Sequence, residues 1–256
     1  MEINKIYNEN CLDTMARMPD ELIDLAVTSP PYDNLRKYSG FTWDFEAVAK
    51  QLYRVTKKGG VVVWVVGDAT IKGSETGTSF KQALFFKEIG FNLHDTMIYA
   101  KNNPIPLTHN RYEQQFEYMF VLSKGKPKAF NSIKIECKNA GVEYNVNRPQ
   151  IYDGSAKRHQ RNEVLKTKKN KIKNNIWFYS VGVDKKKNTS HTAPFPEQLA
   201  SDHIISWSNE NDIVYDPFMG SGTTAKMAIL NKRNWIGSEI SKEYCEIAEK
   251  RINENL

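Results

Sequence analysis

The segment VYDPFMGSGTTAKMAILNKRNWIGSEI, residues 214–240, constrains the fold more than any other part of this chain. Its apolar start predicts a strand, which runs into a glycine-rich turn and a helical pattern before a second strand ends at Glu239. Gly220, Gly222 and Ala225 match the pattern G-x-G-x-x-G/A, which is typical of a strand-to-helix turn that binds a nucleotide. The segment therefore predicts one strand–helix–strand unit of a parallel sheet.

The residues of this turn suit a ligand that carries a nucleoside. Glycines allow the backbone to bend tightly and approach a ligand, and the following helix offers unpaired N–H groups to an anionic group. Asp216 precedes the turn, and Glu239, seventeen residues after Gly222, can accept hydrogen bonds from both hydroxyls of a ribose. No Gly-Lys-Ser/Thr sequence follows, which excludes a Walker-type phosphate loop. A glycine-rich turn without a ligand remains the alternative.

The position of this unit in the chain limits the architecture. Only seventeen residues follow Glu239, so the remaining strands of the sheet must come from the N-terminal half. Segments rich in β-branched and aromatic residues predict strands at 5–8, 23–28, 61–67, 96–101, 117–123, 213–215 and 235–239. Apolar residues three and four positions apart predict helices at 12–18, 44–56, 79–90, 196–208, 223–232 and 242–252. This alternation predicts an α/β fold with a circularly permuted, mostly parallel sheet and helices on both faces.

A second unusual segment, TSPPY at residues 28–32, follows the apolar strand predicted at 23–28. Two consecutive prolines cannot continue a sheet ladder or a helix. Ligands of such sheets bind at the carboxyl ends of the strands. We therefore expect the proline-rich segment and the glycine turn to face one crevice.

Basic residues are concentrated in one part of the chain. Segment 124–187 has seventeen Lys and Arg against five acidic residues, a net charge of +12, whereas the whole chain carries +6. Such a segment suits a nucleic acid, because each Lys or Arg that meets a phosphate releases a counterion. The candidates for these contacts are Lys157, Arg158, Arg161, Lys168, Lys169, Lys171 and Lys173. A solvated surface helix or loop is the alternative for the lysine-rich run at 166–175.

The cysteines and the N-terminus indicate the compartment. Cys11, Cys137 and Cys245 are too few and too scattered for a disulfide framework or a C-x-x-C metal site, so we expect free thiols and no metal. The start of the chain has no apolar signal-peptide core, and the longest strongly apolar run, 61–66, is far too short to span a membrane. These features predict a cytoplasmic protein without a membrane partner.

Three motifs together resemble one enzyme family. TSPPY and DPFMGSGTT, in that order and about 190 residues apart, with HTAPFPEQL at 191–199, resemble the β subclass of amino-group DNA methyltransferases. The resemblance implies a Rossmann-like methyltransferase fold, S-adenosylmethionine as cofactor, and double-stranded DNA as substrate. A homodimer and a cognate restriction endonuclease are further partners that it suggests. Cytosine-C5 methyltransferases need a catalytic Cys directly after Pro. The chain has no Pro-Cys pair, which excludes that class of methyltransferase.

The resemblance also divides the chain and assigns the catalytic loop. Residues 1–124 form the catalytic half, 125–187 the basic target-recognition region, and 188–256 the cofactor-binding half. An exocyclic amino group is a poor nucleophile because its lone pair is delocalised into the ring. The Ser29 hydroxyl and the Pro30 carbonyl can accept hydrogen bonds from the two N–H groups of this amino group, and Pro31 helps to hold the carbonyl rigidly. Tyr32 offers a flat face for a base that has swung out of the duplex, and Arg36 is expected to help close the site on DNA.

Cofactor contacts follow from the same resemblance. Phe218, Gly220, Ser221, Thr223 and Thr224 are assigned to the methionine portion, and Asp216 and Gly222 are further cofactor-binding candidates of the same turn. Glu239 is assigned to the ribose, Ile240 to the adenine ring, and Phe195 to the carboxylate end. Asn10 and Cys11 lie where the family has a turn that contacts the adenine, although Asn10 replaces the usual Asp. Its amide oxygen can still accept a hydrogen bond from an adenine amino group.

Alternatives differ in which features they explain. The hypothesis of a nicotinamide-dependent oxidoreductase explains the glycine turn but not the basic segment or the two prolines. The hypothesis of a non-catalytic nucleic-acid-binding module explains the basic segment but gives no role to a nucleoside pocket. Within the family, Asp at the position of Ser29 is typical of adenine methylation, whereas Ser occurs mostly with cytosine. The sequence therefore favours N4 of cytosine as the target, with N6 of adenine as the alternative.

Overall fold

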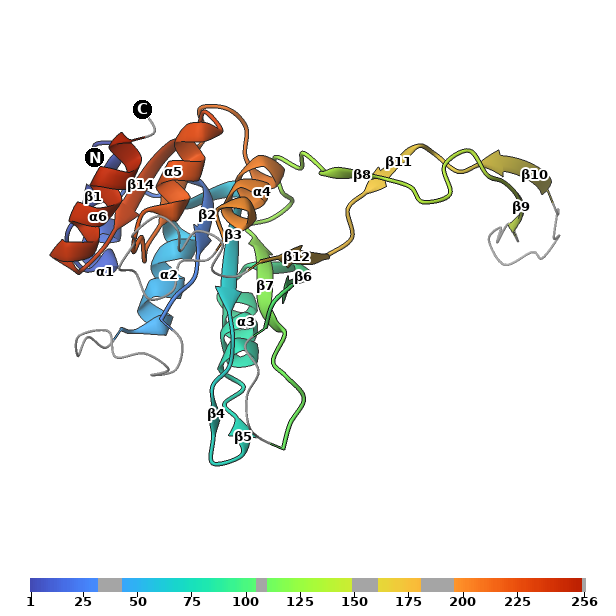
Figure 1. Cartoon of the computed structure of the whole chain (residues 1–256). Coiled ribbons are helices and arrows are strands. Elements are labelled where there is room, and N and C mark those ends of the chain that lie inside the picture. Colours follow the sequence, from blue (N-terminus) through green and yellow to red (C-terminus); the bar gives the residue numbers. More distant parts are fainter. Residues whose placement is uncertain (32–42, 105–109, 149–160, 181–195, 255–256) are drawn as a thin grey trace. The chain divides into compact units, whose positions relative to one another are not determined.

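The computed structural model describes residues 1–31, 43–104, 110–148, 161–180 and 196–254 (Figure 1). The chain divides into two compact units, one of Met1–Asn131 with Asn175–Leu256 and one of Ser132–Asn174. The first unit contains both the glycine turn and the start of the proline-rich segment, and the second contains much of the basic segment.

An eight-stranded sheet forms the centre of the first unit, in the order β1-β14-β13-β2-β3-β7-β6-β12. Its strands are β1 (Lys5–Tyr7), β2 (Ile23–Thr28), β3 (Thr56–Val66), β6 (Asn92–Lys101), β7 (Phe116–Ser123), β12 (Ile176–Tyr179), β13 (Ile213–Asp216) and β14 (Asn234–Ser238). Every pairing is parallel except those that β7 makes with β3 and β6. Because β13 and β14 lie between β1 and β2, both ends of the chain build one sheet, which confirms the predicted permuted, mostly parallel α/β fold.

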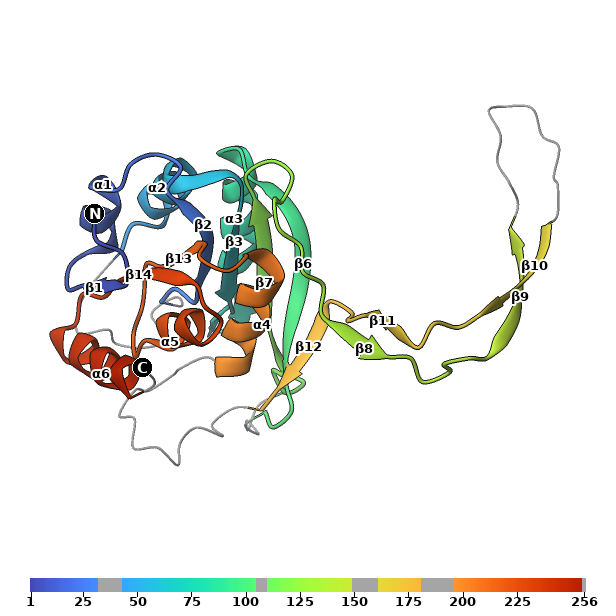
Figure 2. The same cartoon turned by 90° about the horizontal axis from the view of Figure 1, so that it is seen from above.

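Within the described residues, six helices cover the two faces of the sheet (Figure 2). One layer consists of α1 (Cys11–Ala16), α2 (Phe45–Val55) and α3 (Thr78–Glu88), and the other of α4 (Glu197–Trp207), α5 (Thr223–Leu230) and α6 (Lys242–Asn253). A short hairpin of β4 (Thr70–Ile71) and β5 (Ser74–Glu75) precedes α3. None of the described helices combines the length and apolar character that a membrane crossing requires.

Local side-chain chemistry explains where several helices begin. The side chains of Asn10, Asp44 and Ser241 each accept a hydrogen bond from a backbone N–H in the first turn of α1, α2 and α6. Such caps satisfy N–H groups that have no partner within the helix. The predicted helices and strands are all present, with ends shifted by a few residues.

The core of the first unit gathers around β3. Trp64 is fully buried, and its indole N–H donates a hydrogen bond to Oε1 of Gln82 at 2.8 Å. Phe86 of α3 packs against it with ring centroids 5.2 Å apart, and Leu52 of α2 belongs to the same cluster. These contacts fix the α2 and α3 layer on the strand next to β2.

The second unit is built from two antiparallel strand pairs. β8 (Lys134–Glu136) pairs with β11 (Asn170–Ile172), and β9 (Glu143–Arg148) pairs with β10 (Arg161–Lys166). Backbone hydrogen bonds from Cys137 to Lys169 and from Gly141 to Thr167 join the two pairs into one ribbon. The lysine-rich run at 166–175 therefore includes a strand rather than the surface helix that was one alternative.

One aromatic segment of the basic region belongs to the first unit. β12 pairs in parallel with β6 at the edge of the eight-stranded sheet. Trp177 and Tyr179 are buried, whereas Ile176 and Phe178 are exposed. These two buried aromatic residues are thus part of the protein core.

Candidate active site

Four strand ends meet at one edge of the sheet. β1, β14, β13 and β2 are parallel neighbours, so the loops that follow them leave from the same edge. Val214 pairs with Leu25 and Tyr215 with Ala26, which puts Asp216 beside the end of β2. The proline-rich segment and the glycine turn therefore begin side by side.

Asp216 joins these two segments. Its Oδ1 accepts hydrogen bonds from the Thr28 hydroxyl at 2.6 Å and from the Phe218 N–H at 3.0 Å, and its Oδ2 accepts one from the Thr224 hydroxyl at 2.7 Å. We call this arrangement the Asp216 bridge. Asp216 is 1% exposed, and this burial raises its pKa to about 6 although the three donors oppose the rise. Since both oxygens are bonded within the protein, a cofactor contact of Asp216 stays a prediction.

The glycine turn is held in shape by its neighbours. Gly220 and Gly222 have left-handed φ angles of 51° and 80°, which glycine adopts most readily. A Cβ on Gly222 would lie 2.9 Å from the Cβ of Ala248 in α6, so helix packing also requires glycine there. The Gly220 N–H donates to Oε2 of Glu239 at 2.8 Å. The turn is therefore formed by contacts within the protein.

Glu239 follows β14 and is half-buried. Its Oε1 accepts a hydrogen bond from the Ser241 N–H at 2.9 Å, while Oε2 is bonded to Gly220. Burial raises the pKa of Glu239, and the backbone donors around it act in the opposite direction. Each carboxylate oxygen has a second lone pair, so the group retains acceptor capacity for ribose hydroxyls. Ile240 is 40% exposed, which leaves its side chain able to pack on a planar ring.

The loop after β1 contributes Asn10 and Cys11. The side-chain oxygen of Asn10 accepts a hydrogen bond from the Leu12 N–H at 2.9 Å. Cys11 is 6% exposed, and burial raises the pKa of its thiol to about 12, which favours the neutral thiol over the thiolate. Asn8, which the sequence did not indicate, donates through Nδ2 to the carbonyls of Glu239 and Ile240 at 2.9 and 3.1 Å. It ties the β1 loop to the β14 loop.

The buried hydroxyls of Ser221 and Thr223 contact an arginine of α6. Nη1 of Arg251 donates to Ser221 Oγ and Thr223 Oγ1, each at 3.0 Å. Arg251 also pairs with Glu197 of α4, which binds Lys226 at 2.7 Å. Burial acts to raise the pKa of Glu197, but hydrogen bonds from Lys226 and Arg251 lower it. The roles of these hydroxyls at the cofactor stay predictions, and Arg251 is a residue that sequence reasoning missed.

The remaining candidates differ in how much the structure describes. Pro30 is buried, and Ser29, Pro31 and Phe218 are half-buried. Phe218 packs against Trp43 with ring centroids 5.1 Å apart. Five candidates lie outside the described residues: Tyr32, Arg36, Lys157, Arg158 and Phe195.

The second unit carries the other basic candidates. Lys168, Lys169 and Lys171 are exposed, Lys173 is half-buried, and Arg161 begins β10. All of these residues lie on the second long segment of the ribbon, which contains β10 and β11. In the part of this unit that the structure describes, no helix covers either face of the ribbon.

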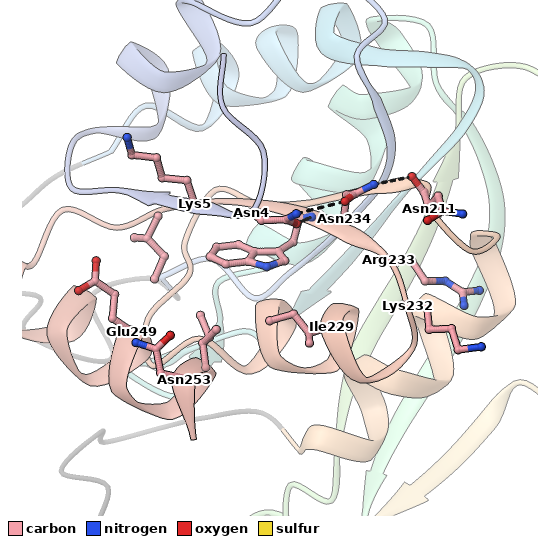
Figure 3. Close-up of a pocket in the computed structure, with 12 residues that line it drawn as sticks. Asn4, Lys5, Asn211, Ile229, Lys232, Arg233, Asn234, Glu249 and Asn253 are labelled. Atoms are coloured by element: carbon pink, nitrogen blue, oxygen red, sulfur yellow. Dashed lines mark hydrogen bonds between the residues drawn. The ribbon is translucent and has the colours of Figure 1, made fainter. Parts of the chain in front are cut away.

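A cavity of about 570 Å³ lies at the opposite edge of the sheet, by the amino ends of β1 and β14 (Figure 3). Trp235, Ile229 and Ile252 provide apolar lining, and Lys5 and Lys232 line it as well. Both lysines are already paired with surface carboxylates, Glu2 and Glu210. The cavity shares no residue with the four strand-end loops described above.

Known proteins resemble this chain over most of its length. A family model described as DNA methylase, for N6 and N4 methyltransferases, matches residues 23–250. The orphan methyltransferase M.BamHII of Bacillus amyloliquefaciens is 57% identical over 240 residues, which cover 91% of this chain and 89% of that protein. The structure of the M1.HpyAVI–SAM complex matches with a TM-score of 0.60 and 25% identity, over 96% of this chain and 98% of that one. PvuII DNA methyltransferase, a cytosine-N4-specific enzyme, shares the fold, with a TM-score of 0.70 and 21% identity over 98% and 90% of the chains.

The family match extends from β2 to α6, and so includes the loops after β2, β13 and β14. The expected contacts of Glu239 with the ribose of S-adenosylmethionine and of the start of α5 with its carboxylate fit the chemistry of these groups and stay predictions. The same match covers the ribbon of the second unit. This chain therefore belongs to the family of S-adenosylmethionine-dependent DNA methyltransferases that modify N6 of adenine or N4 of cytosine.

Proposed function

We propose that this chain transfers a methyl group to the exocyclic N4 of cytosine in double-stranded DNA. The observation that carries the proposal is the position of Ser29, which directly follows Thr28 at the end of β2 and lies next to the cofactor turn. By family resemblance, Ser at this position favours cytosine. N6 of adenine is the alternative, because the family includes enzymes for both bases.

The proline-rich segment is proposed to activate the amino group. The nitrogen of the amino group needs a lone pair that is less delocalised into the ring. Two hydrogen-bond acceptors aimed at its N–H groups favour the pyramidal geometry that provides it. The Ser29 hydroxyl and the Pro30 carbonyl are suited to this role. Pro30 and Pro31 restrict the backbone, so the carbonyl is oriented before the base arrives. Tyr32 is assigned to stacking with the flipped base, which keeps it near the acceptors.

The glycine turn and its neighbours are proposed to orient the cofactor. Bound S-adenosylmethionine supplies the methyl group on a positively charged sulfur. Glu239 holds the ribose hydroxyls, Ile240 and Phe218 provide apolar surfaces, and the start of α5 at Thr223 faces the carboxylate. Catalysis then rests mainly on in-line placement and on exclusion of water.

The second unit is proposed to bind DNA. Its ribbon has the two-stranded form that the major groove admits, and its exposed lysines suit the phosphate backbone. We assign 125–187 to target recognition, and 1–124 and 188–256 to the two halves of the catalytic domain. Arg36 is assigned to DNA contact from the catalytic half.

Partners other than DNA remain predictions. The relative that is 57% identical is named an orphan methyltransferase, which favours a solitary enzyme over one with a cognate restriction endonuclease. The expected homodimer can be tested by light scattering at several protein concentrations. A single monomeric mass at all concentrations would contradict it.

The decisive experiment identifies the methylated nucleoside. Unmethylated duplex DNA is incubated with the protein and labelled S-adenosylmethionine, digested to nucleosides and separated. Label in N4-methylcytosine supports the proposal. Label in N6-methyladenine would make adenine the target base but leave the roles of the catalytic residues unchanged. Label in 5-methylcytosine would contradict both the target atom and those roles.

A further inference from the structure

A single buried carboxylate connects the two halves of the proposed reaction. Thr28, directly before Ser29, donates to Asp216 across 188 positions of sequence. Phe218 and Thr224, which donate to the same carboxylate, lie on either side of the glycine turn. The Asp216 bridge therefore contacts the segment proposed to hold the amino group and both ends of the turn proposed to hold the methyl donor.

Water is excluded from this bridge. Thr28 is 0% exposed, Thr224 and Asp216 are each 1% exposed, and all three hydrogen-bond distances to the carboxylate fall between 2.6 and 3.0 Å. Hydrogen bonds to an ionised acceptor in a dry interior are shorter and stronger than those between neutral groups. The relative position of the two segments is thus determined by direct contacts.

We propose that Asp216 and Thr28 are positioning residues for methyl transfer, setting the distance between the amino nitrogen and the methyl donor. The inference rests on the proposed function, because it requires the two segments to hold those groups. In-line transfer needs the reacting atoms within about 3 to 3.5 Å and aligned, and a displacement of about 1 Å can cost 100-fold in rate. Neither residue touches the reacting atoms in this assignment.

The hydroxyl of Thr224 provides a way to separate geometry from charge. It lies 2.7 Å from Asp216 Oδ2 and 3.2 Å from the Val27 carbonyl, yet a hydroxyl has only one proton to donate. In Asp216→Asn, the amide nitrogen can donate to Thr224, whose proton then turns to Val27. The amide oxygen still accepts from Thr28 and Phe218. Asp216→Asn therefore keeps the bridge without its charge, whereas Asp216→Ala removes the bridge.

The test measures the single-turnover rate of methyl transfer and, separately, the dissociation constant of S-adenosylmethionine by calorimetry. Thr28→Val has nearly the shape of Thr but cannot donate, and it is expected to lower the rate about 10-fold or more. Asp216→Ala is expected to lower it about 100-fold. Thr28→Ser should stay within about 3-fold of the wild-type rate, and Asp216→Asn should retain more of that rate than Asp216→Ala. Cofactor affinity should change by less than about 3-fold in both Thr28 variants, because Thr28 is not among the residues assigned to the cofactor and the bridge acts on distance.

Tyr215→Phe is the matched control. Its hydroxyl is buried and lies 2.8 Å from Ser238 Oγ, so the variant breaks a comparable contact between β13 and β14 that does not reach the β2 segment. Its rate should match the wild type. The double variant that combines Thr28→Val with Asp216→Ala should have the same rate as Asp216→Ala alone, because Asp216→Ala already removes the bridge to which Thr28 donates. Thermal unfolding verifies that every variant is folded.

The outcomes separate this inference from the proposed function. If the wild type methylates neither amino group, the proposed function fails, whatever the variants do. If the wild type is active but Thr28→Val and Asp216→Ala retain its rate, the positioning role is wrong. Equal losses of rate and of cofactor affinity in Thr28→Val, or losses of rate matched by Tyr215→Phe, would show a general structural effect and would also overturn it. Where Asp216→Ala does not fold, the contrast between Thr28→Val and Thr28→Ser decides.

Discussion

The carboxyl edge of the sheet and the ribbon of the second unit hold their residues in different ways. At the edge, Asp216 and Arg251 connect segments that lie far apart in the chain, and Glu239 joins the glycine turn to the loop after β14, all through buried or half-buried contacts. In the ribbon, β8–β11 and β9–β10 pair with each other, and side chains such as Ile172 are exposed. A two-stranded ribbon has little core of its own. The difference indicates that the carboxyl edge is organised by contacts within the protein, whereas the ribbon leaves side chains exposed, which suits its proposed role as a DNA surface.

The largest expected effect compares two apolar truncations. Phe86→Ala, in the core beside Trp64, should lower the free energy of unfolding by about 3 to 5 kcal/mol, because it leaves a cavity. Ile172→Ala, which is 54% exposed in β11, should change it by no more than about 0.5 kcal/mol. Urea unfolding measures both. A loss of similar size at Ile172 would show that the ribbon has a core and would break the comparison.

The second prediction concerns the pH dependence of stability. The folded pKa of Asp216, about 6, is raised above its ordinary value of 3.8, so the native state binds this proton more tightly than the unfolded state. The resulting stabilisation is full below about pH 4 and is lost as the pH rises through 6. Relative to Asp216→Asn, the wild type should therefore lose up to about 3 kcal/mol between pH 4 and pH 7.

Urea unfolding of both proteins at several pH values checks this difference. Asp216→Asn should be at least as stable as the wild type at pH 7, because it keeps the bridge without a buried charge. A difference in free energy of unfolding that stays constant from pH 4 to pH 7 would mean that Asp216 titrates near its ordinary value. The bridge would then be sufficient to offset the cost of burying the charge.

A smaller effect is expected for the ligand at the same edge. Glu239→Ala should weaken S-adenosylmethionine binding by about 1.5 to 3 kcal/mol, the range for hydrogen bonds that involve a charged group. Calorimetry measures it, and DNA binding without cofactor should be unchanged. Glu243→Ala, an exposed acid in the first turn of α6, is the matched control and should bind like the wild type. Equal affinity of Glu239→Ala and the wild type would remove Glu239 from the cofactor site.

Sequence reasoning succeeded where local patterns were enough. The apolar run before Thr28 and the strand before Gly220 could be recognised one at a time, and the shortage of chain after Glu239 required both ends to build one sheet. Strand order then put the loops after β2 and β13 at the same edge. The adjacency of these two loops thus followed from strand patterns and chain length.

The contacts within that edge could not be predicted in the same way. Arg251 reaches Ser221 and Thr223 only because α6 packs against α5, and Gly222 permits that approach. A basic residue in the last turn of a helix has many ordinary roles, so its type alone gave no signal. Asn8 was missed for the same reason, since its partners are backbone carbonyls of a distant loop.

The pairing of strands in the basic region could likewise not be predicted from the sequence. Lys171 lies opposite Ile135, a register that depends on two segments separated by a long connection. β12 has only four residues, and its alternation of exposed and buried side chains was too short to distinguish from a polar loop with aromatic residues. Composition indicated a charged surface there but not its strands.

The last prediction tests the ribbon as a DNA surface and has the smallest effect per residue. Replacing Lys168, Lys169, Lys171 and Lys173 by Gln should weaken DNA binding and reduce the slope of log affinity against log salt by about 0.9 per lost phosphate contact. Cofactor affinity should not change, because none of these residues is assigned to the cofactor. The control replaces four exposed lysines of the first unit, Lys50, Lys72, Lys81 and Lys87, which changes the net charge equally. If both variants reduce the slope alike, DNA responds to net charge alone, and the ribbon is not a specific binding surface.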